Sequence, residues 1–213
     1  MSEIDSIARK IISALEARNA AREQALASSR KVIQHSALSI RATHRADFAE
    51  AERLLALARE AAGQMREGAR AYPELYHTGY VQDALKEFAE ASIVSALVQS
   101  QPLPDPDALW VEYAAYLNGM GEAAGELRRH ALDLIRQGRA REAEATLQWM
   151  EDIFSVLVTV DFPDAITGGL RRTTDMVRGV LERTRGDVTL MIKQEELLSA
   201  MRKAQPDDVQ SAR

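Results

Sequence analysis

The stretch YVQDALKEFAEASIVSALVQ, residues 80–99, decides the fold, because it reads as a helix that other elements cover on both sides. Val81, Leu85 and Phe88 recur at helical spacing along one side. The opposite side carries acids in its first half, and it continues into Val94 and Leu97 in its second half. A helix that is apolar on both sides belongs to the interior of a helical assembly.

The rest of the chain has the composition of a helical protein. Only 5% of the 213 residues are aromatic, 46% are hydrophobic, and Ala, Leu, Arg and Glu dominate. No long Pro, Gly or Ser tract divides the chain, so we expect one compact domain over residues 1–203 and a frayed tail over 204–213. The predicted class is all-α, an elongated bundle of seven helices.

The expected helix boundaries follow from breaks in the periodic pattern. A first helix without Pro or Gly extends from about 4 to 45, with Ala25, Val32, Ile33, Leu38 and Ile40 among its apolar positions. Asp47 is a candidate N-cap for the second helix. Five more helices are expected over about 79–99, 107–138, 140–160, 164–184 and 188–203. Segments that contain proline or glycine separate them, and RGD at 185–187 is the last of these breaks.

Composition also restricts the location and the partners. The chain has no cysteine, which excludes disulfides and thiolate chemistry and makes a cytoplasmic location the default. No stretch approaches the roughly 18 apolar residues of a membrane span. A formal charge of −5 argues against a uniformly basic nucleic-acid-coating surface, although it allows a local basic patch.

Three acids of the opening stretch lie on one side of its helix. Asp83, Glu87 and Glu90 stand at i, i+4 and i+7, where like charges repel. A solvated polar face is the ordinary explanation for such spacing. Because the same side becomes apolar further along, we expect it to be covered, so that the acids require cations, protonation or a metal ion. Magnesium is the simplest partner, since it binds carboxylate oxygens from more than one helix.

A second pair of acids, Glu122 and Glu126, lies at i and i+4 in YLNGMGEAAGEL, residues 116–127. Gly119, Gly121 and Gly125 surround this pair, and each costs about 1 kcal/mol relative to Ala in a helix interior. Close approach of another backbone or of a ligand would explain these glycines. Tight helix packing with two solvated glutamates is the alternative explanation, and such clusters are often structural.

Four segments resemble the translin family, and within it the nuclease branch that includes translin-associated factor X and single-chain prokaryotic proteins. YVQDALKEFAEA resembles that branch's helix with two glutamates three residues apart, and YLNGMGEAAGEL resembles its Tyr-Leu-x-Gly segment. SRKVIQHSALSIRATHR, residues 29–45, and MEDIFSVLVTVDFPDAITGGLRRTTDMVRGVLERTRGD, residues 150–187, match in the same order. The four motifs together extend over most of residues 20–190.

The resemblance implies a seven-helix fold that assembles into a hollow, octamer-like homo-oligomeric shell and binds single-stranded RNA or DNA. It also implies that Glu87, Glu90, Glu122 and Glu126 are catalytic metal ligands for Mg²⁺, with Mn²⁺ as an alternative. Glu122 departs from the family pattern, in which aspartate is usual, and Asp83 has no catalytic counterpart. Four carboxylates can hold one or two magnesium ions that activate water and polarise a phosphate.

Arginines supply the candidate nucleic-acid contacts. Phosphate binding and ordinary ion pairing with neighbouring acids are equally compatible with their pattern. No aromatic residues interleave with them, so sequence-specific base recognition is not expected. The candidates are Arg128, Arg129, Arg171, Arg172 and Arg178.

Three functions remain open at this stage. The first is a magnesium-dependent endoribonuclease acting on single-stranded RNA. The second is a translin-like binding protein that does no chemistry, and the third is a helical scaffold whose acids pair with arginines. His35 and His44 lie in the first helix, where polar-face or core roles are expected rather than metal ligation. A lone Glu74-x-x-His77 motif is insufficient for a di-iron bundle, which needs two such motifs and two further glutamates.

Overall fold

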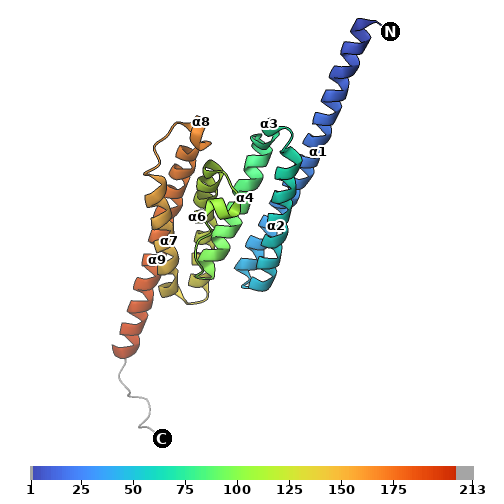
Figure 1. Cartoon of the computed structure of the whole chain (residues 1–213). Coiled ribbons are helices and arrows are strands. Elements are labelled where there is room, and N and C mark those ends of the chain that lie inside the picture. The colour runs from blue at the N-terminus through green and yellow to red at the C-terminus, as the bar shows by residue number, and fades with distance from the viewer. Residues whose placement is uncertain (1, 205–213) are drawn as a thin grey trace.

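The computed structural model describes residues 2–204, and over that range every regular element is a helix (Figure 1). The predicted all-α class is confirmed. Six long helices and three single-turn helices follow in chain order: α1 Glu3–His44, α2 Phe48–Ala69, α3 Pro73–Tyr76, α4 Gly79–Val98, α5 Pro106–Leu109, α6 Tyr113–Arg136, α7 Ala140–Leu157, α8 Asp164–Thr167 and α9 Leu170–Ala204.

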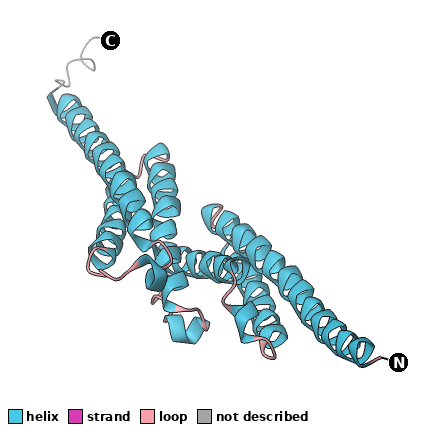
Figure 2. Ribbon diagram, turned by 90° about the horizontal axis from the view of Figure 1, so that it is seen from above, coloured by secondary structure: helices cyan, strands magenta, loops and turns pink. Residues whose placement is uncertain are grey.

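The long helices form an elongated row with α4 near its centre. The α1–α2 pair packs on one side of α4, and α6 packs on the other, followed by α7 and α9 (Figure 1). The first half of α1 and the last part of α9 project from opposite ends of the row, as both Figure 1 and Figure 2 show. None of the helices in residues 2–204 combines the length and the apolar character that a membrane span requires.

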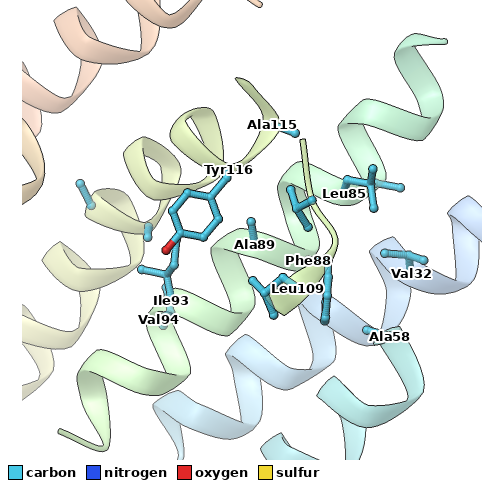
Figure 3. Close-up of a cluster of buried hydrophobic side chains, with 14 of the residues drawn as sticks. Val32, Ala58, Leu85, Phe88, Ala89, Ile93, Val94, Leu109, Ala115 and Tyr116 are labelled. Carbon is cyan, nitrogen blue, oxygen red and sulfur yellow. The ribbon is translucent and has the colours of Figure 1, made fainter. Parts of the chain in front are cut away.

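The core lies where α4 is covered from both sides, as its sequence predicts. Leu85 and Phe88 are completely or almost completely buried, and they lie near Val32 of α1 and Ala58 of α2 (Figure 3). Ile93, also fully buried, lies near Tyr116 of α6 on the other side. Truncating one such large side chain to alanine typically costs about 2–5 kcal/mol, so the α4 core holds the two halves of the row together.

The buried face of α1 combines predicted apolar positions with small polar residues. Ala25, Val32 and Ile40 are buried, as predicted. Ile33 is exposed and Leu38 is half-buried, whereas Ser36 and Ser39 are completely buried. The Ser39 hydroxyl donates to the Ala51 carbonyl oxygen at 2.9 Å, so its polar group is satisfied between the helices. Small side chains let the two helices approach closely, which the apolar pattern alone does not indicate.

Three predicted boundaries are wrong. The helix expected from 164 is only the single turn α8, because Gly168 is left-handed (φ 61°), and the long helix α9 begins at Leu170. The expected break at RGD is absent, since α9 continues through Gly186 to Ala204. Leu181 and Val188 are buried on either side of that glycine, and their burial outweighs its cost of about 1 kcal/mol. The helix expected from Asp107 begins instead at Tyr113, because Trp110 adopts a left-handed conformation (φ 57°) that ends the single turn α5.

The other expected limits agree with the structure to within a few residues. Asp47 is the N-cap of α2, and its side chain accepts from the Glu50 backbone N–H. The predicted tail, residues 204–213, lies outside the described residues apart from Ala204, which belongs to α9.

Candidate functional site

The candidate site forms where the backbones of α4 and α6 touch. A Cβ atom on Gly119 would lie 2.6 Å from the carbonyl oxygen of Lys86 and 3.1 Å from the backbone nitrogen of Glu90. No side chain fits at such distances from backbone atoms, so residue 119 must be glycine for the two helices to meet here. Glu122 follows Gly119 by about one turn of α6, and the close approach therefore brings it to the acids of α4.

Three carboxylates gather at this contact, and we call them the carboxylate triad: Glu87, Glu90 and Glu122. One oxygen from each lies within 4.8 Å of one from each of the others. Glu90 is the most buried of the three, with 8% of its surface exposed, whereas Glu87 and Glu122 are half-buried. Asp83, in contrast, is exposed and does not join the group.

Burial and mutual repulsion make the triad reluctant to carry full negative charge. Burial, together with the charges of Glu87, Glu122 and Glu126, raises the pKa of Glu90 to about 8. Burial also raises the pKa of Glu87, and the nearby Glu122 adds to this effect. Near neutral pH, Glu90 therefore holds a proton that a bound cation would displace.

Lys86 is the cation closest to the triad. Its Nζ donates to Glu122 Oε1 at 2.7 Å and lies 4.0 Å from Glu87 Oε1. Burial lowers the pKa of Lys86, but the hydrogen bond and the charge of Glu122, with smaller effects of Glu87 and Asp83, outweigh burial and leave the pKa raised. The ammonium group is thus charged, and it lies within 4.0 Å of two carboxylates, those of Glu122 and Glu87.

The fourth predicted ligand, Glu126, lies two turns beyond Gly119 on α6 and turns toward α1. Its Oε2 lies 2.5 Å from Nε2 of His44, a side chain that is only 4% exposed. This hydrogen bond lowers the pKa of Glu126 despite burial, and Arg129 contributes in the same direction. The bond ties α1 to α6 beside the triad, and it fixes the orientation of the carboxylate.

The donor set fits a hard divalent cation. All ligand atoms of the triad are carboxylate oxygens, the ligands that magnesium and manganese prefer. In an octahedral site with ligand bonds of about 2.1 Å, oxygens lie about 3 to 4 Å apart. The observed limit of 4.8 Å is slightly wider, and small rotations of the half-buried Glu87 and Glu122 side chains close the difference.

Comparison with known proteins places the chain in a family. No protein-family model matches the chain. The chain is 26% identical over 198 residues to an uncharacterised protein of Methanocaldococcus jannaschii. This match covers 92% of this chain and 87% of the other protein. The structure of Archaeoglobus C3PO with duplex RNA, a protein of the translin-associated factor X type, superposes with a TM-score of 0.81 at 35% identity, covering 87% of this chain and 96% of that one. The chain belongs to the translin family.

Two further structures have the same fold. Archaeoglobus C3PO without RNA gives a TM-score of 0.80 at 34% identity, covering 87% of this chain and 97% of the other. The apo structure of a second C3PO, NeC3PO, gives a TM-score of 0.76 at 20% identity, covering 90% of this chain and 98% of the other. The predicted translin-like architecture is confirmed by these matches.

The candidate arginines of this translin-family chain lie in different environments. Arg128 is bound to Thr184 and Asp187 of α9, so it holds α6 to α9. Arg171 and Arg178 lie 3.7 Å and 3.6 Å from exposed aspartates, and Arg178 also covers the ring of Phe154. Such exposed pairs are weak, and they leave the guanidinium groups able to meet phosphate.

Arg172 and Arg129 are the candidates nearest to the acids. Arg129 is exposed and lies 4.0 Å from Glu126. Arg172 lines a cavity of about 710 Å³ whose wall also includes Lys86 and Glu122. Within residues 2–204, no carboxylate lies within 4.0 Å of the Arg172 guanidinium.

Sequence reasoning missed two residues of the site. Lys86 stands four residues before Glu90 on the same helix, a spacing that could have identified it as a neighbour of the acids. His44 is 82 positions away from Glu126, and no local pattern connects the two.

Proposed function

We propose that this chain binds RNA and cleaves it internally as a magnesium-dependent endoribonuclease. The observation that carries the proposal is the carboxylate triad, in which Glu87, Glu90 and Glu122 converge from two helices with their oxygens within 4.8 Å of one another. Membership of the family supports the proposed RNA binding, since the structure of the Archaeoglobus relative is a complex with duplex RNA.

The roles of the side chains follow from their environments. Glu87, Glu90 and Glu122 would hold Mg²⁺ or Mn²⁺, which supplies an activated water and positive charge at the phosphate. Glu90 would give up its proton when the cation binds, because the positive charge would offset the burial and the repulsion that raise its pKa. Glu126 is the proposed fourth catalytic ligand, and its bond to His44 holds the carboxylate in place.

The proposed substrate contacts lie on the cavity that adjoins the triad. Arg172 and Lys86 on its wall present positive charge to a phosphate backbone beside the acids. Arg128, Arg129, Arg171 and Arg178 remain the further candidates. Single-stranded RNA is the predicted substrate and single-stranded DNA a predicted ligand, and the relative's complex makes duplex RNA a necessary comparison.

We also propose self-association into an octamer-like shell. The projecting part of α1 carries large apolar side chains that α2 and α4 do not cover: Ile4, Ile7, Ile11, Ile12 and Leu15, each more than half exposed. An exposed apolar patch of this kind is typical of an interface. Light scattering of the purified protein tests this part, and a monomer would contradict it.

A non-catalytic RNA-binding protein is the second candidate. The observation that favours it is the ion pair of Lys86 with Glu122, since acids neutralised by a lysine need no metal ion. This reading predicts RNA binding that neither magnesium nor EDTA affects.

The experiment is cleavage of end-labelled single-stranded and duplex RNA with Mg²⁺, with EDTA, and with the double variant Glu87→Gln, Glu90→Gln. We expect magnesium-dependent internal cuts that the double variant abolishes while RNA binding persists. A matched control is Glu52→Gln, which changes an exposed glutamate of α2. Binding without cleavage in every condition would establish the second candidate and overturn the nuclease.

A further inference from the structure

Lys86 lies in the position that a second cation would take in a two-metal carboxylate site. Its Nζ is 2.7 Å from Glu122 and 4.0 Å from Glu87, so it stands between two members of the triad from different helices. The side chain is only 22% exposed. A lysine on a solvated helix face would project into water instead.

The packing of α4 on α6 keeps Lys86 in this place. Its backbone carbonyl is the atom that a Cβ on Gly119 would meet at 2.6 Å, so the main chain of residue 86 is pressed against α6. The four-carbon side chain of Lys86 then reaches Glu122, which lies about one turn beyond Gly119 on α6. The ammonium group therefore adjoins the triad as a consequence of the helix contact.

The charges around Lys86 leave room for one divalent ion. When fully ionised, the three carboxylates carry three negative charges, and the ammonium group cancels one of them. Asp83 is exposed and Glu126 is bonded to His44, so the nearest charges that a metal ion meets are those of the triad and Lys86. One divalent cation cancels the remaining two. A second divalent cation would leave the cluster with excess positive charge and would meet the ammonium group within the same few ångströms, which is unfavourable in a half-buried site.

We propose that Lys86 serves as the second cation of the carboxylate triad, so that the site takes a single divalent metal ion and Lys86 presents the other positive charge to the substrate phosphate. Lys86 lines the 710 Å³ cavity together with Arg172, which gives a phosphate a route to both cations. The inference rests on the proposed function, and it specifies the metal count of the same site.

Metal stoichiometry tests the inference without any measurement of cleavage. Isothermal titration of the full chain with Mn²⁺ at pH 7.5 should give one ion per chain for the unaltered protein. Lys86→Met removes the charge and keeps the length of the side chain, so we expect a second Mn²⁺ to bind. The first ion should bind to Lys86→Met at least about tenfold more tightly than to the unaltered protein, because a nearby positive charge is gone. Spin coupling between the two Mn²⁺ ions, seen by electron paramagnetic resonance, would identify the pair.

Two further variants make the result specific. Lys86→Arg retains the charge and should bind one Mn²⁺. Lys193→Met breaks another lysine–glutamate pair, in which Lys193 lies 2.8 Å from Glu196 on the exposed part of α9, and it should leave stoichiometry and affinity unchanged. Circular dichroism checks that each variant is helical, and Lys86→Gln replaces Lys86→Met if the latter does not fold.

Each outcome has one meaning. Two Mn²⁺ ions in the unaltered protein, or one ion of unchanged affinity in Lys86→Met, would overturn the inference while magnesium-dependent cleavage could still establish the nuclease. No Mn²⁺ binding at all would overturn the inference together with the metal part of the proposed function. One ion rising to two in Lys86→Met, and not in Lys86→Arg, establishes it.

Discussion

Glu90→Gln should stabilise the metal-free protein at alkaline pH, because the native fold disfavours the charge on Glu90. The pKa of Glu90 is raised from 4.5 to about 8, so between these values the native state binds a proton that the unfolded state has lost. The stabilising effect of this proton is fully present below pH 4.5 and is lost as the pH rises through 8. Stability of the unaltered, metal-free protein therefore falls across this range.

The size of the effect follows from the two pKa values. At about 1.4 kcal/mol per pH unit, the interval from 4.5 to about 8 corresponds to an upper limit of about 4–5 kcal/mol. In a chain of this size each kcal/mol changes the melting temperature by about 2–4 °C. Glutamine has the shape of the protonated acid and does not titrate, so Glu90→Gln should melt about 10 °C above the unaltered protein at pH 9, and close to it at pH 5.

Differential scanning calorimetry in EDTA between pH 5 and 9 measures the difference. Glu52→Gln, a change to an exposed glutamate of α2, is the matched control and should follow the unaltered protein at every pH. If Glu90→Gln keeps the pH dependence of the unaltered protein, the burial argument for Glu90 is refuted. Added Mn²⁺ should stabilise the unaltered protein and have little effect on Glu90→Gln, since the variant lacks a ligand.

Four further variants test the geometry. Gly119→Ala should lower the free energy of unfolding by about 1–3 kcal/mol and weaken Mn²⁺ binding, because its Cβ would lie 2.6 Å from a backbone oxygen. Gly125→Ala, whose Cβ would meet no atom of residues 2–204 within 4 Å beyond its own turn of helix, should raise the free energy of unfolding by about 0.5–1 kcal/mol. Urea denaturation measures both changes. His44→Phe should raise the pKa of Glu126, because the hydrogen bond that lowers it is lost while burial remains, as carboxyl ¹³C NMR titration of the metal-free protein would show. Arg172→Gln should weaken RNA binding and reduce the salt slope of the binding constant by about 1, measured by fluorescence anisotropy.

Each of these has a clear opposite result. Stabilisation by both glycine substitutions would mean that α4 and α6 do not touch at residue 119. An unchanged Glu126 titration would remove His44 from the site. An unchanged salt slope would place the RNA away from the cavity that Arg172 lines.

The sequence was most informative where burial repeats along a helix. Residues 80–99 predict a helix covered on both sides, and the structure buries Val81, Leu85 and Val94 completely. The ends of helices were harder to predict, because the local propensities of residues such as glycine compete with tertiary packing. The glycine of RGD marks a helix end by propensity, yet buried Leu181 and Val188 carry α9 through it.

The site was predictable in its acids and not in its cations. Spacing alone put Glu87 and Glu90 on one side of a helix, and the glycines indicated a close approach near Glu122. Which atoms meet across that approach depends on the crossing of α4 and α6, which no local pattern encodes. The contacts of Lys86 with Glu122 and of His44 with Glu126 are consequences of the tertiary fold.

The energetics of the triad connect its geometry to its function. A chain adapted for stability alone would gain from a neutral residue at position 90, because burial and three neighbouring carboxylates oppose the charge there. Lys86 offsets only part of this repulsion, and Gly119 increases it by holding the two acid-bearing helices in contact. In the proposed metal site this free energy would be recovered when a cation binds, so the residues that weaken the metal-free fold would strengthen its affinity for a divalent ion. The unfavourable arrangement of acids is therefore the property that a metal site on these two helices would require.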